Sequence, residues 1–325
     1  MNSSASPSIQ RDITLHLQGD WGIANLHRIC GWIMAEMGRR SGAGSRFATW
    51  SGRGGTDAFE VLFNKSVDLS LFVPACFAPG ASRMPVVKAA GDPGSLRAIA
   101  TLPQNDALVI AVDARLGISS LDDIRKKKPA LRIAAAHDDG VNPVGFTTHR
   151  LLELAGLPRK DLEAWGGRFV EGEGPWDVIP LGTSGEADVV IFEAIMTKYW
   201  RDMTAARDWV FLSLDKDLLG RFESAYAVAP KVVPAGRFKG QDQPLDTIDF
   251  SDFLLMARAE LADDVAYLLA WCLCNTRATI EAQYLHLAPE NSPLTYPLNP
   301  RAMATTSLPL HPGAQRYYRE AGLLA

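Results

Sequence analysis

Apolar runs of strand length alternate with helix patterns along most of this chain. Residues 13–17 alternate like a strand, and residues 26–37 read as a helix. Strand patterns return at residues 46–50 and 69–73, with a helix expected over residues 56–64 between them. Because strands and helices take turns in this way, the sequence predicts an α/β fold with mostly parallel sheets.

The same alternation continues in the rest of the chain. Residues 96–112 hold two strand-like segments joined by a short polar break, which suits a crossing between two lobes. Further strands are expected over residues 131–135 and 188–192. A strand over residues 247–257 and a long helix over residues 263–281 follow.

The length of 325 residues favours two lobes, because a single core stops growing at about 250–300 residues. A second crossing is expected near residues 224–229, before an irregular stretch at 230–244. We therefore place lobe I at residues 1–103 and 224–325, and lobe II at residues 104–223. Two open α/β lobes joined by two crossings place loops on either side of a cleft, where ligands of such sheets bind.

Composition and charge exclude several classes of function. Hydrophobic residues make up 47% of the chain and charged residues 22%, which is typical of an ordinary globular protein. The net charge is −4 and the basic residues are scattered, so nucleic-acid binding has little support. Cys30, Cys76, Cys272 and Cys274 lie in apolar surroundings and are expected to be packing residues. No zinc spacing, phosphate loop or Ser-His-Asp signature is present, so neither a metal nor a cofactor is expected.

The start of the chain bears on its location. Residues 1–11 are polar and lack the apolar run of an export signal. The longest apolar run, residues 107–112, is far shorter than the roughly 20 residues that span a bilayer. As written, the sequence therefore predicts a cytoplasmic protein, or a periplasmic one if a leader precedes it.

Four segments resemble the TAXI-type solute receptors of tripartite TRAP transporters. They are residues 51–56 with 67–73, residues 96–102 with 117–124, residues 233–241, and the terminal helix at 310–324. The resemblance implies a two-lobed type II periplasmic-binding-protein fold with a ligand cleft between the lobes. It also implies a small amino acid or dicarboxylate ligand, and membrane permease subunits as possible partners.

Two loops depart from the family pattern. The turn before the second-lobe helix contains Pro143, which removes a backbone donor. The first loop, residues 19–25, lacks the small residues and tyrosines typical of such receptors. Both departures concern the ligand and leave the expected fold unchanged.

The loop after the second strand is the best candidate for an anion site. It contains Ser51, Arg53 and Gly54, and Trp50 precedes it. Glycines allow successive backbone N–H groups to turn inward toward an anion, and Arg53 can pair with a carboxylate. The alternative is a tight strand-to-helix turn with a solvated arginine.

The loop after the first strand adds three further candidates. Trp21 would supply an aromatic wall for the ligand, while Asp20 or Asn25 would supply a polar anchor. Loops at strand ends commonly carry binding residues. The alternative is that Asp20 caps a helix and Trp21 packs on the surface.

Lobe II contributes His137, Asn142 and Glu193 as ligand candidates, each just beyond a predicted strand. His137, Asp138 and Glu193 are also the candidate acid–base groups if the protein is an enzyme. Alternatively, Asn142 caps a helix, and Glu193 is a strand-end side chain paired with Lys198 or Arg201.

These patterns lead to one main hypothesis and two alternatives. The main one is a non-catalytic clamp that binds a small organic acid or amino acid, with a carboxylate as the group recognised. The first alternative is a cytoplasmic lyase on the same fold, a decarboxylase or dehydratase of an organic acid, similar to chorismate dehydratase and the dihydroxyphthalate decarboxylases. The second is an intracellular sensor. The sequence leaves the oligomeric state open.

Overall fold

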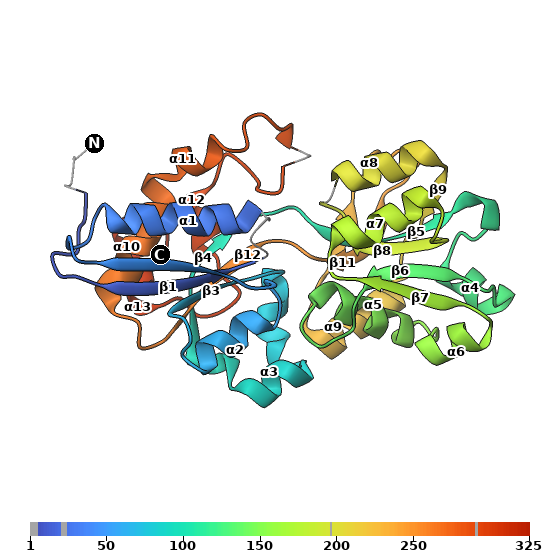
Figure 1. Cartoon of the computed structure of the whole chain (residues 1–325), viewed down its shortest axis with the longest axis horizontal. Coiled ribbons are helices and arrows are strands. Elements are labelled where there is room, and N and C mark those ends of the chain that lie inside the picture. The colour runs from blue at the N-terminus through green and yellow to red at the C-terminus, as the bar shows by residue number, and fades with distance from the viewer. Residues whose placement is uncertain (1–5, 21–24, 196, 290–291) are drawn as a thin grey trace. The chain divides into compact units, whose positions relative to one another are not determined.

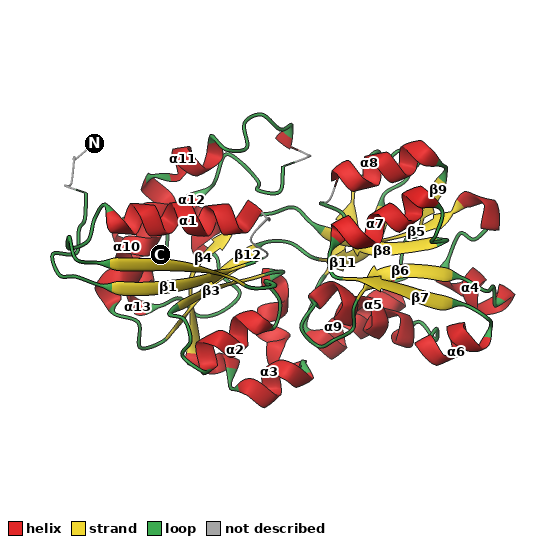
Figure 2. Ribbon diagram, viewed as in Figure 1, coloured by secondary structure: helices red, strands yellow, loops and turns green. Residues whose placement is uncertain are grey.

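A computed structural model describes residues 6–20, 25–195, 197–289 and 292–325 (Figure 1). The chain divides into two compact units, each with its own sheet (Figure 2). Unit 1 comprises Met1–Gln104 and Asp252–Ala325, and unit 2 comprises Asn105–Ser251. None of the helices in the described part of the chain is long and apolar enough to cross a membrane.

Unit 1 contains a five-stranded sheet in the order β2-β1-β3-β12-β4. Its strands are β1 (Thr14–Gly19), β2 (Arg46–Ser51), β3 (Leu69–Phe72), β4 (Leu96–Leu102) and β12 (Phe253–Arg258). The first three are mutually parallel, and β12 runs antiparallel between β3 and β4. The sheet lies in the interior of unit 1, as the almost complete burial of β3 and β4 shows.

The helices of unit 1 cover both faces of this sheet. They are α1 (Asn25–Gly38), α2 (Asp57–Phe63), α3 (Pro85–Ala90), α10 (Asp263–Asn275), α11 (Arg277–Glu281), α12 (Pro300–Ala304) and α13 (Pro312–Glu320), with 3-10 turns at Ala75–Arg83 and Pro93–Ser95. The connections from β1 to β2 and from β2 to β3 run in opposite directions across the sheet. Right-handed crossovers therefore place α1 and α2 on opposite faces (Figure 1).

Unit 2 contains a seven-stranded sheet in the order β10-β11-β5-β8-β6-β7, with β9 paired to β5. The strands are β5 (Ala107–Asp113), β6 (Arg132–Ala136), β7 (Arg168–Gly172), β8 (Val189–Glu193), β9 (Trp209–Phe211), β10 (Pro230–Val233) and β11 (Leu245–Asp249). The helices are α4 (Leu121–Lys127), α5 (Pro143–Leu154), α6 (Arg159–Ala164), α7 (Pro175–Ser184), α8 (Thr197–Ala206) and α9 (Lys216–Tyr226), with a 3-10 turn at Ala114–Leu116. Strands β6, β7 and β8 are parallel.

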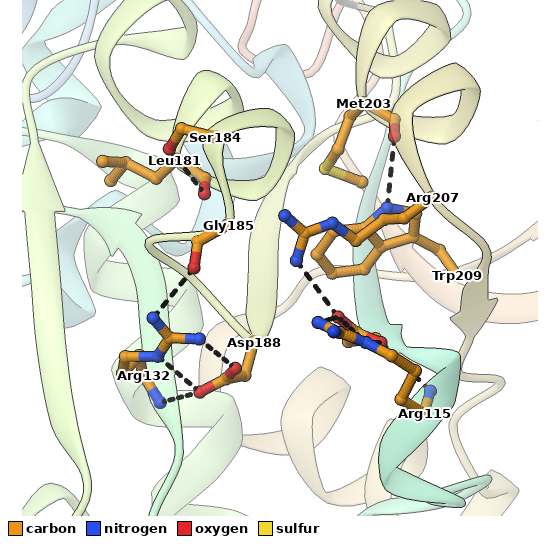
Figure 3. Close-up of polar contacts among 10 residues, drawn as sticks. Arg115, Arg132, Leu181, Ser184, Gly185, Asp188, Met203, Arg207 and Trp209 are labelled. Atoms are coloured by element: carbon orange, nitrogen blue, oxygen red, sulfur yellow. Dashed lines mark hydrogen bonds and ion pairs between the residues drawn. The ribbon is translucent and has the colours of Figure 1, made fainter.

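Ion pairs hold the edge of this sheet where β6 and β8 begin. Arg132 binds Asp188 at 2.5 Å between Nη2 and Oδ1 (Figure 3). The buried Asp113 accepts from Arg115 at 2.6 Å and from Arg207 at 3.1 Å. Hydrogen bonds from Arg115 lower the pKa of Asp113 to about 2. These contacts join the starts of β6 and β8 and anchor the end of β5, so the charged groups at this edge have a structural role.

The second crossing lies later in the chain than the sequence indicates. Residues 224–251, expected in lobe I, belong to unit 2, because β10 pairs with β11 and β11 pairs with β5. The single strand expected over residues 247–257 is two strands in different sheets, separated at Asp252, whose φ is +67°. The stretch 230–244, expected to be irregular, begins with β10.

The long helix expected over residues 263–281 is interrupted. Helix α10 ends at Asn275, and α11 begins at Arg277. Between them Thr276 has a φ of −110°, and its Oγ1 donates to the carbonyl oxygen of Cys272 at 2.7 Å. A side-chain hydrogen bond of this kind to a helix carbonyl oxygen disfavours continuation of the regular helix. Cys30, Cys272 and Cys274 are buried and Cys76 is half-buried, and none of the four forms a disulfide bond.

Candidate functional site

The candidate residues of unit 1 gather at one edge of its sheet. Because β1, β2 and β3 are parallel, their carboxyl ends at Gly19, Ser51 and Phe72 lie at the same edge. Gly19 and Ser51 are paired in register. Asp20 follows β1, and the glycine loop, which we define as residues 51–55, follows β2. This is the edge at which ligands of parallel sheets bind.

The glycine loop is held by the chain's own acceptors. The N–H of Gly52 donates to the carbonyl oxygen of Gly19 at 3.1 Å, and the N–H of Arg53 donates to Asp57 Oδ2 at 2.7 Å. The N–H of Gly55 also donates to the Asp57 carboxyl. Three of the amides expected to cradle an anion are therefore satisfied internally, and Asp57 takes the place proposed for the ligand.

Asp57, the first residue of α2, is a half-buried acid that is absent from the candidates of the sequence analysis. Its Oδ2 also accepts from Gln18 Nε2 at 3.0 Å, while its Oδ1 has no hydrogen-bond partner among the described residues. Burial raises the pKa of Asp57, and the loop amides and the Arg53 charge oppose that effect. Arg53 is thus close enough to act on Asp57 electrostatically.

Asp20 is a buried carboxylic acid directly after β1. Its exposed fraction is 5%, and its Oδ1 has no hydrogen-bond partner within the described part of the chain. The carboxyl accepts a hydrogen bond from the backbone N–H of His27 in the first turn of α1. Burial raises the pKa of Asp20 to about 7 despite that hydrogen bond.

Gly54 packs directly against Asp20. Its φ is +72°, a conformation that favours glycine. A Cβ at this position would lie 3.1 Å from Asp20 Cβ and 3.4 Å from Val73 Cγ1. The glycine loop and Asp20 are therefore parts of one packed arrangement.

The remaining candidates of unit 1 differ in exposure. Trp50 is 52% exposed, and its ring centroid lies 6.0 Å from that of His16 at a tilt of 59°. Ser51 is exposed and Arg53 is half-buried. Asn25 is the first residue of α1. Trp21 lies outside the described residues.

In unit 2 the candidates also gather where parallel strands end. Strands β6, β7 and β8 end at Ala136, Gly172 and Glu193. The N–H of His137 donates to the carbonyl oxygen of Gly172 at 3.2 Å. The register pairs Ala134 with Val190, and continuing it brings His137 level with Glu193.

Asn142 caps α5, as its structural alternative suggested. It is 2% exposed, and its Oδ1 accepts from Val144 N at 3.0 Å while its Nδ2 donates to the carbonyl oxygen of Glu173 at 3.0 Å. Asp139 Oδ1 accepts from the N–H groups of Val141 and Asn142. The Asn142 side chain is thus fully engaged in shaping the loop and the helix start.

The three acid–base candidates have different environments. His137 is exposed, and Asp138 pairs with Arg150 at 2.9 Å. Glu193 is half-buried, and its carbonyl oxygen accepts from Trp200 Nε1 at 2.7 Å. Lys198, considered as a partner of Glu193, pairs with Asp202 at 2.7 Å.

Comparison with known proteins places the chain in a family. The model of the NMT1-like family matches residues 47–322. The chain belongs to the NMT1-like family. A comparison with curated protein sequences finds no match.

Solved structures share the fold of this NMT1-like protein. MatC from Rhodopseudomonas palustris with bound malate has a TM-score of 0.51 at 13% identity, covering 95% of this chain and 97% of that chain. PhnD1 from Prochlorococcus marinus in complex with methylphosphonate has a TM-score of 0.51 at 13% identity, over 96% and 99%. XAC2383 from Xanthomonas citri bound to chloride ion has a TM-score of 0.50 at 13% identity, over 95% and 97%. The expected α/β fold of the two-lobed periplasmic-binding-protein type is confirmed.

The NMT1-like protein also has buried polar residues that the sequence did not single out. Asp106 is 1% exposed and accepts from the N–H groups of Ala107 at 2.7 Å and Ile195 at 2.9 Å. Burial raises its pKa to about 7. Thr147 and Thr148 on α5 are wholly buried. Only an acid immediately before an apolar run marks Asp106 in the sequence, and that signal also fits a turn.

No group of three or more His, Cys, Asp or Glu side chains among the described residues is arranged to hold a metal ion. The described candidate side chains carry carboxyl, amide, imidazole, indole, hydroxyl and guanidinium groups.

Proposed function

We propose that the protein is a solute receptor that binds a small molecule between its two units and closes on it. The supporting observation is that, in each unit, the crossovers join the same edge that carries the candidate residues. In unit 1, β4 ends at Leu102, which pairs with Phe253 at the start of β12, next to the end of β3 at Phe72. Two short connections leave from that edge.

The same holds in unit 2. Strand β5 begins at Ala107, which pairs with Asp249 at the end of β11. Next to it, Leu108 pairs with Glu193 at the end of β8. Both crossovers therefore enter unit 2 at the edge that carries Glu193 and His137. This topology supports a site formed by the two strand edges, with residues 103–106 and 250–252 as its hinge.

Backbone hydrogen bonds join the two segments of this hinge. Asp252 N donates to the carbonyl oxygen of Gln104 at 3.2 Å within unit 1, and Phe250 N donates to that of Asp106 at 3.3 Å within unit 2. Closure would be driven by contacts that the solute makes only in the closed state.

A carboxylate-bearing solute fits the arginine of this edge best. Arg53 offers a planar donor pair suited to carboxylates. Structures of the same fold hold malate and methylphosphonate, both small anions. We extend the proposal to a TAXI-like receptor that works with membrane permease subunits.

The lyase alternative has weaker support. Asp138 is held by Arg150, and His137 is exposed to water. A general acid or base must be able to reach the proton that it moves, and the carboxyl of Asp138 is already engaged by Arg150. The proposal therefore rests on binding without turnover.

A thermal-shift screen against carboxylates, phosphonates, sulfonates and amino acids tests this function. A true ligand raises the melting temperature with concentration, because stabilisation follows RT ln(1 + [L]/Kd). Arg53→Ala is expected to weaken carboxylate binding about tenfold or more. Arg46→Ala, at the opposite end of the same strand, is the matched control and keeps the affinity. Absence of any stabilising solute would contradict the proposal.

A further inference from the structure

Strand β2 forms one edge of the sheet of unit 1, and this edge has no partner strand among the described residues. In the strand order β2 is the first strand, and it pairs only with β1. The N–H of Arg46 donates to the carbonyl oxygen of Ile13 at 2.8 Å, on the side of β1. Because the backbone groups of a strand point alternately to its two sides, those of Phe47, Thr49 and Ser51 point away from β1.

Two other sheet edges of the protein are protected, in contrast to β2. At the opposite edge of the same sheet, the N–H of Ala98 on β4 donates to the carbonyl oxygen of Pro309 at 2.9 Å, and the N–H of His311 donates to that of Ala98 at 2.8 Å. In unit 2 the edge strand β10 begins with Pro230 and carries Lys231, residue types that disfavour pairing with another chain. Strand β2 contains no proline, lysine or acid, and its phenylalanine, threonine and tryptophan favour strands.

The side chains of β2 also form an exposed patch on one face of the sheet. Trp50 is 52% exposed, and Arg46 on the same face is exposed too. Arg46 makes no ion pair within the described part of the chain. Between these two residues lies Ala48, which is small and half-buried. The patch therefore combines a large aromatic ring, a small residue and a cation along a free edge.

This edge is complementary to a second copy of itself. In an antiparallel pair with Thr49 opposite Thr49 of the second copy, Phe47 stands opposite Ser51. The outward backbone groups of all three residues are then hydrogen-bonded across the pair. The same register sets Trp50 opposite the small Ala48 of the second copy, so that each exposed ring covers a residue that leaves room for it.

The charges fit the same register. Arg46 stands opposite Gly52 of the second copy and diagonally across from its Trp50, within reach of a cation–π contact. A Cβ at Gly52 would lie 2.8 Å from Asp57 Oδ2, so the face that Arg46 approaches carries a carboxyl. Each copy thus presents a cation to an aromatic ring and a carboxyl of the other copy.

We propose that β2 pairs antiparallel with β2 of a second copy of this chain, Thr49 opposite Thr49, and that this pairing joins the two copies into a dimer. The contact is short, since β2 has 6 residues, whereas stable interfaces bury roughly 1,200–2,000 Å². The dimer is therefore expected to dissociate on dilution. The inference concerns a protein surface and does not depend on the proposed function.

Sedimentation equilibrium of the full chain from about 1 to 500 μM tests the proposal, and the dimer fraction is expected to rise over this range. Thr49→Pro removes an outward donor, and Trp50→Lys places a charge on the edge. Each is expected to raise the dissociation constant about tenfold or more. Val232→Lys, on edge strand β10 where Val232 is 54% exposed, is the matched control and is expected to leave the constant unchanged. Circular dichroism checks that the variants fold.

Oxidative cross-linking tests the register. Thr49→Cys in a Cys76→Ser background is expected to form a disulfide-linked dimer, because Cα atoms about 5.5 Å apart across such a pair suit a disulfide bond. Arg46→Cys in the same background is the control. The register places residue 46 opposite residue 52, so this variant is expected to stay monomeric under the same oxidation.

The outcomes decide between pairing and its absence. A protein that stays monomeric over the whole concentration range would overturn the proposal, including the case in which the edge accepts only an extended segment of another protein. A dimer that folded Trp50→Lys retains undiminished would also overturn it, because the contact would then lie on another surface. Cross-linking of Arg46→Cys without cross-linking of Thr49→Cys would contradict the antiparallel register.

Discussion

At the scale of single residues, the buried carboxyl of Asp20 makes stability depend on pH. Its pKa is raised from 3.8 to about 7 by burial. Between pH 4 and pH 7 the folded protein keeps a proton that the unfolded chain has lost. The contribution of Asp20 to the free energy of unfolding is therefore complete below pH 4 and is lost as the pH rises to 7.

Asp20→Asn should remove this dependence. Relative to the wild type, the variant is expected to gain stability from pH 4 to pH 7, by roughly 4 kcal/mol at most, since each pH unit corresponds to about 1.4 kcal/mol. Urea unfolding of both proteins at pH 4.5, 6 and 7.5 measures the difference. A difference that does not change with pH would contradict the burial argument.

Gly54 offers a second residue-scale prediction. Gly54→Ala places a Cβ at a φ of +72° and 3.1 Å from Asp20 Cβ. Gly322→Ala in the same unit meets a φ of +67° with nothing within 4 Å, so it measures backbone strain alone. We expect Gly322→Ala to cost about 1 kcal/mol, and Gly54→Ala to cost about 1 kcal/mol more. Chemical unfolding compares them, and equal costs would mean that the Asp20 contact is unimportant.

The sequence predicted where the candidate residues lie relative to the strands, but not the contacts that they make. Asp20 and Arg53 follow β1 and β2, and Glu193 is the last residue of β8, close to where the apolar runs placed them. The carboxyl of Asp57 accepts hydrogen bonds from the N–H groups of Arg53 and Gly55. These bonds depend on the backbone conformation of the loop, which no local sequence pattern predicts. Asn142 caps helix α5, which is the structural alternative given for it in the sequence analysis.

At the scale of elements, the packing of α13 on α10 depends on one glycine. A Cβ on Gly313 would lie 2.0 Å from the carbonyl oxygen of Asp263, so α13 would have to move. Gly313→Ala is expected to cost about 3 kcal/mol or more. Gly31→Ala in α1, with nothing within 4 Å, is expected to stabilise by about 0.5–1 kcal/mol. Thermal unfolding distinguishes the two, and similar shifts would contradict the close approach.

Elements with one clear period were predictable, and interrupted ones were not. Strands β1, β2 and β3 follow alternating or fully apolar runs. The strand pattern at residues 247–257 is nearly continuous, yet the strand is interrupted at Asp252, which has a positive φ. A glycine there would have indicated a break in the strand, whereas an aspartate rarely adopts this conformation. The break at Thr276 lies in an apolar stretch whose helical period continues past it.

At the scale of the whole molecule, the two units differ in chain continuity. Unit 2 is one continuous segment, whereas unit 1 is built from both ends of the chain. The strands of unit 2 form one sheet, and each of them pairs only with strands of the same unit. Residues 105–251 expressed alone are therefore expected to unfold in one cooperative transition by calorimetry. A fragment without such a transition would mean that unit 2 needs unit 1 to fold.

The central claim is that a small solute binds at the strand edges of both units. A crystal structure with a solute identified by the screen tests this most directly. The account predicts solute density in contact with Asp20 or Arg53 of unit 1 and with residues 137–142 or Glu193 of unit 2. Density on another surface, or against one unit only, would contradict it.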